Sequence, residues 1–291
     1  MENIQEIKRK IENRKSDLLF NLSWYLNYPL TKPNLLTIML TKRCNLNCKY
    51  CFEVNNRKIL PEMSYPEIIK VLQNAIKMKI NCFNPLGGEI FLRKDTLKIL
   101  EFAQKNGMVT AITTNGTLLN KEICKELVSL CRDNKMFLTF SLDGSNKEEN
   151  DRVRGESFNK IIENISYLVK ERERQNKKLI IAVNTVISKN NLGNFSGMMN
   201  LTKELRIDLF QWISCVVLSD NMRKSMVEND LFIKPEDFKL LNSEVDFLIK
   251  CKKENLYVKI ANDLTSLNNY KRFYRNQYYQ NEKFIKNFKK Q

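Results

Sequence analysis

Histidine is absent from this sequence of 291 residues. Structural zinc sites in proteins combine cysteine and histidine ligands, usually four of them in spaced pairs. The chain contains eight cysteines, but only Cys48 and Cys51 form a C-x2-C pair. A zinc knuckle would need a fourth cysteine or a histidine at related spacing, so the sequence argues against one.

Long apolar runs are also absent. No run reaches the length of about eighteen residues that a transmembrane helix needs, so we expect no membrane partner. The N-terminus, Met1–Lys10, is charged throughout and lacks the apolar core of a secretory signal peptide. We therefore expect a cytoplasmic protein, in which cysteines are metal ligands or buried thiols rather than disulfides.

Acidic residues are too few to balance the basic ones. The chain has 49 Lys and Arg against 33 Asp and Glu, which gives a net charge of +16. Such an excess can attract nucleic acid or an acidic peptide. The charge is spread along the chain, however, and aromatic residues do not alternate with arginine as they do in a single-strand binding groove. We therefore do not expect nucleic acid as a partner.

A short run between Thr41 and Cys51 carries the strongest chemical signal. Cys44, Cys48 and Cys51 stand there at C-x3-C-x2-C spacing, with Tyr50 directly before the third cysteine. Three thiolates in one short loop can hold three irons of a [4Fe–4S] cube. The fourth iron then lacks a protein ligand, and an open position on a metal is what allows chemistry. Three buried core cysteines are the alternative.

Apolar runs alternate with amphipathic segments from residue 35 onward. The runs that we expect as strands are Leu35–Leu40, Asn81–Leu86, Met108–Thr114, Met136–Leu142, Leu179–Val186 and Ile207–Cys215. The helices expected to follow them are Ser64–Met78, Thr96–Asn106, Lys121–Cys131, Phe158–Gln175 and Phe195–Leu205. This alternation indicates a parallel sheet with crossover helices. We expect an α/β fold, a partial (β/α)6 TIM-like barrel, flanked by an N-terminal helical extension and a C-terminal helical tail.

The chain divides into three expected regions. Residues 1–33 form the N-terminal helical extension, with Ile4, Ile7 and Ile11 at helical spacing; it either packs against the barrel or docks a partner. Residues 34–234 form the barrel, and 216–234 are expected to be a loop. The remainder, 235–291, is expected to hold a helix at Pro235–Lys253, a short strand at Leu256–Ile260, and a tail from Tyr270 that is helical or loosely ordered.

The cysteine run resembles the signature of the radical S-adenosylmethionine (radical SAM) superfamily. The resemblance implies that Cys44, Cys48 and Cys51 ligate a [4Fe–4S] cluster whose open iron binds the amino and carboxylate groups of S-adenosylmethionine (SAM), and that Tyr50 packs beside the adenine. A reductant such as flavodoxin or ferredoxin would supply the electron that cleaves SAM to a 5′-deoxyadenosyl radical. Partial barrels are the fold of this superfamily.

Further motifs follow the later strands, where an α/β barrel places its active-site groups. By resemblance, the segment Gly87-Gly88-Glu89 binds the amino group of SAM, and its carboxylate can accept from an ammonium. The other pocket residues implied are Asn115 of a Thr-Asn-Gly segment, Ser141 and Arg154 as SAM contacts, and Asn184 as a donor. Taken alone, the Asn-Gly pair is an ordinary turn, and Arg154 is an arginine of a solvated loop. Asn150 stands where family members often have histidine, which leaves its role open.

The resemblance is closest to the core domain of SPASM-type peptide and protein maturases, which are similar to anaerobic sulfatase maturases. Those enzymes continue into a cysteine-rich extension with auxiliary clusters, whereas no cysteine follows Cys251 here. We expect either chemistry that needs one cluster or a truncated form. The implied function is hydrogen abstraction from a peptide or protein substrate. The alternatives are a radical SAM enzyme that acts on RNA or a small metabolite, and a non-catalytic iron–sulfur scaffold.

Overall fold

The computed structural model describes residues 15, 18–51, 53, 61–132 and 135–288. Seven strands form one sheet in chain order, and every neighbouring pair is parallel. The strands are β1 (Leu35–Thr41), β2 (Cys82–Gly87), β3 (Val109–Thr114), β4 (Met136–Ser141), β5 (Ile180–Ile187), β6 (Leu209–Ser214) and β7 (Lys259–Ile260). The α/β partial barrel that the sequence predicts is therefore confirmed.

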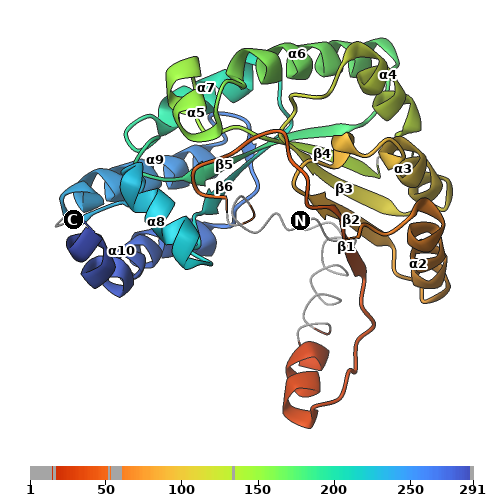
Figure 1. Ribbon diagram of the computed structural model, residues 1–291, viewed down its shortest axis with the longest axis horizontal. Coiled ribbons are helices and arrows are strands. Elements are labelled where there is room, and N and C mark those ends of the chain that lie inside the picture. Colours follow the sequence, from red (N-terminus) through yellow and green to blue (C-terminus); the bar gives the residue numbers. More distant parts are fainter. Residues whose placement is uncertain (1–14, 16–17, 52, 54–60, 133–134, 289–291) are drawn as a thin grey trace, which may run out of the picture.

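Helices provide the crossovers and cover the outer, convex side of the curved sheet (Figure 1). They are α2 (Tyr65–Lys77), α3 (Thr96–Lys105), α4 (Lys121–Leu130), α5 (Lys147–Arg154), α6 (Phe158–Arg174), α7 (Phe195–Glu204), α8 (Asp220–Glu228), α9 (Phe238–Glu254) and α10 (Leu264–Phe288), with short 3-10 turns η2 (Ile90–Leu92) and η3 (Pro235–Asp237). Helix α2 begins where its sequence specifies, because the Ser64 N–H donates to the Glu67 carboxylate at 2.7 Å.

The hydrophobic core lies between the sheet and these helices. Side chains alternate along each strand, so one set faces the helices and the other faces the hollow of the barrel. In β4, Leu138 and Phe140 are fully buried on the helix side, whereas Phe137 and Thr139 on the inner side remain partly exposed. Burying an aromatic or aliphatic side chain of this size contributes about 1.5–3 kcal/mol. The outer face therefore stabilises the sheet and leaves the inner face available for other purposes.

The sheet is an open crescent. Among the described strands, β1 pairs only with β2 and β7 pairs only with β6, so no hydrogen bonds close the barrel. The predicted strand Leu256–Ile260 is present only as the two residues of β7. It extends the six predicted strands to seven.

The loop predicted for 216–234 is wrong, because α8 forms within it. The Ser219 hydroxyl caps the helix by accepting from the Met222 N–H at 3.2 Å. Met222 and Met226, one turn apart, are buried in a small cluster that includes Cys215. Only these two apolar residues mark the helical period, which is too short a pattern to distinguish a helix from a loop.

The C-terminal segment is an integral part of the barrel. The tail predicted from Tyr270 is helical: it belongs to the helix α10, which begins six residues earlier, at Leu264, and runs to Phe288. The Tyr274 hydroxyl of α10 donates to the Ile187 carbonyl at 2.8 Å and accepts from the Cys215 N–H at 3.1 Å. These bonds tie the helix to the carboxyl ends of β5 and β6.

The N-terminal helix, residues 18–26, projects away from the barrel (Figure 1). Its apolar side chains are largely exposed, and Tyr25 reaches 87%. Packing against the barrel is therefore not found for this part of the extension. The predicted apolar repeat at Ile4, Ile7 and Ile11 lies outside the described residues. None of the described helices combines the length and the apolar character that crossing a membrane requires.

Candidate active site

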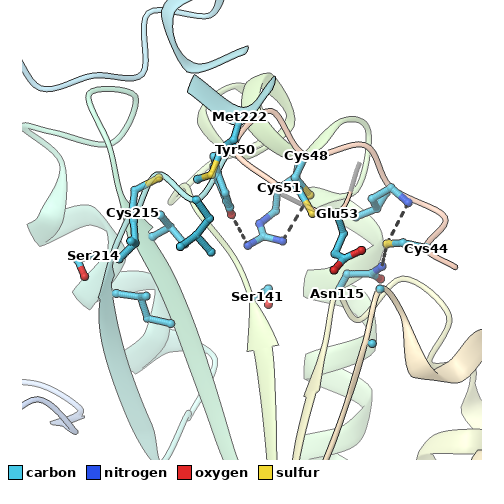
Figure 2. Close-up of a pocket in the computed structure, with 18 residues that line it drawn as sticks. Cys44, Cys48, Tyr50, Cys51, Glu53, Asn115, Ser141, Ser214, Cys215 and Met222 are labelled. Atoms are coloured by element: carbon cyan, nitrogen blue, oxygen red, sulfur yellow. Dashed lines mark hydrogen bonds between the residues drawn. The ribbon is translucent and has the colours of Figure 1, made fainter. Parts of the chain in front are cut away.

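A cavity of about 440 Å³ opens at the carboxyl ends of the strands (Figure 2). It gathers residues that lie far apart in the sequence. Of the predicted site residues, it is lined by Cys44, Cys48, Tyr50, Cys51, Gly87, Gly88, Asn115, Ser141 and Arg154. The structure does not bring Glu89 or Asn184 to the cavity surface.

The cysteine loop is fixed between α5 and α8. The Lys49 N–H donates to the Val153 carbonyl of α5 at 2.9 Å, and the Lys49 carbonyl accepts from the Ser225 hydroxyl of α8 at 2.5 Å. Within the loop, the Cys51 N–H donates to the Cys48 carbonyl at 3.0 Å. The two helices that the sequence did not predict therefore set the position of the second and third cysteines.

The paired glycines hold the other end of the loop. The Gly88 N–H donates to the Thr41 carbonyl at 2.9 Å, and the Glu89 N–H donates to the Arg43 carbonyl at 2.8 Å. A Cβ atom on Gly88 would lie 2.4 Å from the Arg43 oxygen and 2.8 Å from the Cys44 Cβ. The chain around Cys44 can approach this closely only because residue 88 has no side chain.

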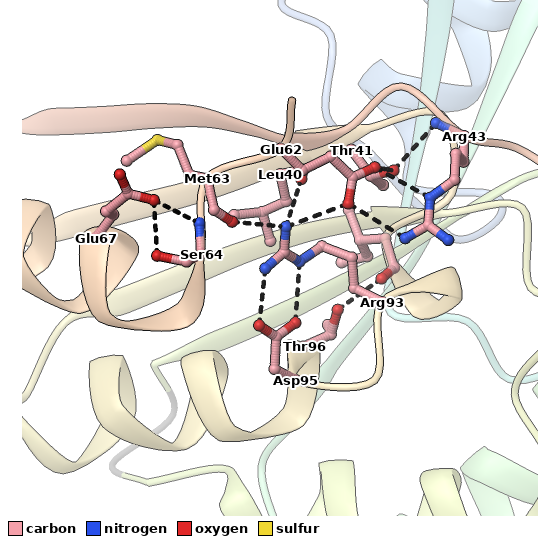
Figure 3. Close-up of polar contacts among 11 residues, drawn as sticks. Leu40, Thr41, Arg43, Glu62, Met63, Ser64, Glu67, Arg93, Asp95 and Thr96 are labelled. Atoms are coloured by element: carbon pink, nitrogen blue, oxygen red, sulfur yellow. Dashed lines mark hydrogen bonds and ion pairs between the residues drawn. The ribbon is translucent and has the colours of Figure 1, made fainter. Parts of the chain in front are cut away.

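A buried arginine anchors the chain where it returns from the loop (Figure 3). Arg93 donates two bonds to Asp95, at 2.9 and 2.7 Å, and one to the Met63 carbonyl at 3.0 Å. Next to it, Glu62 accepts from the Arg43 Nε at 3.0 Å. Although burial opposes it, hydrogen bonding from Arg43 lowers the pKa of the Glu62 carboxyl. Arg43, directly before Cys44, is thereby tied to the segment that leads into α2.

Asn115 links the third strand end to the cysteine loop. Its amide Nδ2 donates to the Asn45 Oδ1 at 2.9 Å, and the Asn45 Nδ2 donates to the Thr117 hydroxyl at 2.8 Å. The same amide lies 3.8 Å from the Cys44 sulfur, as Figure 2 shows. The Thr-Asn-Gly segment therefore forms a turn and also binds the cysteine loop through Asn45.

Arg154 is buried and belongs to α5 rather than to a solvated loop. Its Nε lies 2.6 Å from the Asp143 carboxylate, which is 1% exposed, and its Nη2 donates to the Tyr50 hydroxyl at 2.6 Å. Burial alone would lower the pKa of the guanidinium, but the facing Asp143 carboxylate raises it. Its remaining amino group, Nη1, lies 3.8 Å from the Cys48 sulfur.

Tyr50 completes this buried group. Its hydroxyl also hydrogen-bonds to Asp143, and burial raises its pKa well above the ordinary value. Burial likewise raises the pKa of the Cys48 thiol, and the Arg154 charge opposes that shift. The guanidinium therefore favours a thiolate at Cys48, the form that ligates a metal.

Asn150, whose role the sequence left open, has a structural role. Its Oδ1 accepts from the Asp143 N–H at 3.1 Å, and its Nδ2 donates to the Ser157 hydroxyl at 3.0 Å. Asp143 is held from the other side by the Val186 N–H, which donates to its Oδ1 at 2.8 Å. The ion pair with Arg154 is thus fixed by the Asn150 side chain of α5 and by the backbone of β5.

The three cysteines fit a [4Fe–4S] cube better than a single ion. No described cysteine is in a disulfide. No three cysteine or acidic side chains among the described residues gather closely enough to hold one metal ion. A cube instead presents a separate iron to each thiolate, so sulfurs that surround one cavity suffice. N–H groups of Leu46, Asn115 and Arg154 lie at 3.5–3.8 Å from these sulfurs, as donors that stabilise ligating thiolates.

Glu89 is turned away from the cavity. Its carboxylate accepts from the Thr114 hydroxyl at 2.9 and 3.0 Å, from the Asn115 N–H at 2.7 Å and from the Phe91 N–H at 3.2 Å. Burial raises the pKa of this carboxyl, although these hydrogen bonds oppose the shift. Asn184 lies two residues before the lining residue Val186 on β5, and its carbonyl accepts from the Leu142 N–H at 3.0 Å.

Several lining residues have no motif in the sequence. Those on the side opposite the cysteines are Val186, Ile213, Ser214, Cys215, Val216 and Leu218; those beside the cysteine loop are Leu46, Glu53 and Met222, which packs in one cluster with Tyr50. The first group follows the ends of β5 and β6, which is the only sequence signal that could have found it. It forms a mostly apolar wall, in contrast to the cysteine side.

Known proteins are similar to this chain in sequence. The sequence matches the family model of the Radical SAM superfamily over residues 38–188. An AdoMet-dependent heme synthase of Methanosarcina barkeri is 29% identical over 176 residues, which are 60% of this chain and 48% of that protein. The antilisterial bacteriocin subtilosin biosynthesis protein AlbA of Bacillus subtilis is 31% identical over 157 residues, 53% of this chain and 34% of that protein.

Among solved structures, SuiB of Streptococcus suis bound to S-adenosylmethionine is similar with a TM-score of 0.66 and 19% identity. The alignment covers 79% of this chain and 50% of SuiB. At this identity the likeness shows the shared fold. The chain spans about half the length, or less, of these proteins.

Proposed function

Because this chain belongs to the radical SAM superfamily, whose members use a [4Fe–4S] cluster and SAM, we propose that it is an enzyme that modifies a peptide or protein by radical chemistry. Cys44, Cys48 and Cys51 would hold the cluster. When bound, the cluster supplies the electron that cleaves SAM to a 5′-deoxyadenosyl radical, which abstracts a hydrogen atom from the substrate. The observation that carries this proposal is the convergence of the three cysteines with Gly88, Asn115 and Arg154 around one cavity.

The chain's own residues position and insulate this chemistry. Arg154 and Asn115 place N–H donors beside the Cys48 and Cys44 sulfurs, which stabilises the ligating thiolates. Gly87 and Gly88 bring backbone to the cavity surface, where it can bond the polar end of SAM. The Ser141 hydroxyl at the end of β4 is a further donor for SAM. The apolar wall facing these residues excludes water from the reacting atoms.

Two observations support a peptide or protein substrate. AlbA is a bacteriocin biosynthesis protein, and SuiB has a structure bound to the precursor peptide SuiA. The unpaired edges of β1 and β7 also keep backbone hydrogen bonds from closing the barrel, which suits a polymeric substrate. A reductant of the flavodoxin or ferredoxin class would supply the electron. A porphyrin-like metabolite is the second candidate, because the heme synthase aligns with 60% of this chain.

The test is anaerobic. The protein is reconstituted with iron and sulfide, reduced with dithionite and given SAM, and 5′-deoxyadenosine is followed by chromatography. We expect wild type to form a cluster and release 5′-deoxyadenosine, and Cys48→Ala to do neither. Cys82→Ala, a cysteine at the opposite end of β2, is the control and should behave as wild type. A cluster that leaves SAM intact under every reductant would support an iron–sulfur scaffold instead.

A further inference from the structure

Glu53 is a buried carboxylate that the cysteine motif does not explain. It lies two residues after Cys51, is 9% exposed and lines the cavity together with Cys44 and Gly88. Figure 2 shows its carboxylate between Cys51 and Asn115, on the side of the cavity where the cysteines lie. Its Oε2 atom is buried and accepts no hydrogen bond from the described residues.

A buried carboxylate oxygen without a donor is costly, and native structures rarely keep one without a reason. Among the described residues, Lys42 forms an ion pair with this oxygen, with its Nζ 3.9 Å away. At that distance the ammonium offsets the charge but does not form a hydrogen bond. The position therefore suits a cationic donor that none of the described residues supplies.

Glu89 is the carboxylate that the Gly-Gly-Glu motif predicts as the acceptor for the ammonium group of SAM. Its oxygens already accept from three donors inside the protein, the Thr114 hydroxyl, which lies within reach of both oxygens, and the N–H groups of Asn115 and Phe91. Turning it toward the cavity would break these bonds and leave buried N–H groups unpaired. Glu53 is the acid among the described lining residues, and none of the described residues donates a hydrogen bond to its Oε2.

We infer that Glu53 accepts a hydrogen bond from the α-amino group of SAM, as the side-chain acceptor beside the backbone of Gly87 and Gly88. This inference rests on the proposed function, because it takes SAM as the occupant of the cavity. A hydrogen bond between a charged acceptor and a cationic donor in a buried site is strong enough to change binding by about tenfold to a hundredfold. Glu53 is then a binding residue, which neither ligates iron nor takes part in hydrogen abstraction.

The first measurement is SAM affinity in the anaerobically reconstituted full chain, by equilibrium dialysis. Glu53→Gln keeps the shape of the side chain and removes its charge. We expect the dissociation constant for SAM to rise about tenfold or more. Iron content and the electron paramagnetic resonance spectrum of the reduced, SAM-free protein should not change. Glu101→Gln removes an exposed carboxylate of α3, paired with Lys105, and should match wild type throughout.

The second measurement identifies the atom that Glu53 recognises. In a SAM analogue, hydrogen replaces the α-amino group. Wild type should bind this analogue more weakly than SAM. Glu53→Gln should bind the analogue with the same affinity as wild type, because the substitution and the missing amino group remove the same contact. An equal loss for SAM and for the analogue overturns the inference. So does a loss of iron or an altered SAM-free spectrum in Glu53→Gln, which would make Glu53 an iron ligand or a support of the loop.

Failure of the proposed function would look different. It would be a wild-type protein that holds no cluster, or that holds a cluster and binds no SAM. Both wild-type measurements precede the comparison of variants, so the two failures are distinguished before Glu53 is tested.

Discussion

The two walls of the cavity differ in how they are built. On the cysteine side, Gly88, Asn115 and Arg154 are joined to the cysteine loop by hydrogen bonds and close backbone contacts. On the facing side, Val216 and Leu218, which follow β6, present apolar side chains that are 47% and 64% exposed. A wall whose side chains are bonded to one another suits a cofactor of fixed shape, whereas a wall of exposed apolar side chains can adjust to the substrate.

The largest expected effect comes from adding a methyl group to the constrained wall. In Gly88→Ala, the new Cβ would meet the Arg43 oxygen at 2.4 Å, and the backbone around Cys44 would have to move. We expect iron content after reconstitution to fall to background, as measured by a colorimetric iron assay. Gly107→Ala is the control away from the cavity: its φ of +76° strains any side chain, but only the tip of Lys135 lies within 4 Å of the new Cβ, so iron content should stay at the wild-type level. If Gly88→Ala holds a full cluster, the close approach is not essential.

Removing the buried charge of the same wall should mainly affect stability. Arg154→Met leaves the Asp143 carboxylate buried without its cation. Breaking such a pair costs about 3–5 kcal/mol of unfolding free energy. Urea unfolding measures it, and Lys105→Met, which breaks the exposed pair with Glu101, should cost less than about 1 kcal/mol. Arg154→Met combined with Asp143→Asn should recover part of the loss, and no recovery would contradict the buried-pair explanation.

A change in the apolar wall should act on substrate and leave the cofactor alone. Val216→Ser with Leu218→Ser removes apolar contact area without opening the core, because both side chains are largely exposed. We expect KM for the substrate to rise about tenfold, from roughly 1–1.5 kcal/mol of lost apolar burial. Release of 5′-deoxyadenosine without substrate should stay within about twofold of wild type. Leu256→Ser, which changes an exposed leucine that does not line the cavity, is the control. If the double variant loses substrate affinity and 5′-deoxyadenosine release equally, the two walls do not differ in function.

The smallest expected effect concerns Glu89, the buried carboxylate that is bonded to Thr114 and Asn115. Burial raises the pKa of Glu89 in the folded protein, so the folded state keeps its proton to a higher pH than the unfolded chain. The Glu89 contribution to unfolding free energy is therefore greatest at low pH and declines as pH rises through the folded-state pKa. Glu89→Gln cannot titrate, and its stability relative to wild type should increase with pH in urea unfolding. An opposite slope would mean that the Thr114 and Asn115 bonds outweigh burial.

The constrained wall is also the one that the sequence predicts. Short motifs such as C-x3-C-x2-C and Gly-Gly-Glu carry their spacing in the sequence, and the alternation of strands and helices places them at one end of a sheet. The order of β1 to β6 follows from that alternation. Sequence reasoning cannot give the direction of a side chain. Glu89 belongs to a recognised motif, yet its side chain is turned away from the cavity, whereas Glu53 belongs to no motif and lines the cavity.

The facing wall was missed for a physical reason. Helix α8 is marked by two methionines one turn apart, and its stability comes from tertiary packing against Cys215 and its neighbours. Such packing is visible only once β6 and the cysteine loop are side by side. α5 is similar, because its buried residues include Asn150 and Arg154, polar side chains that a hydrophobic pattern cannot identify as inward-facing.

The unpaired edges of β1 and β7 have a consequence for how a polymer enters. A closed barrel admits a chain only through its mouth, end first, so a residue near a terminus reaches the centre most readily. In this protein, by contrast, no hydrogen bonds join β1 to β7 among the described strands, so backbone pairing does not close the barrel there. Under the proposed function, a residue in the middle of a long polypeptide would then need no free chain end to reach the cavity.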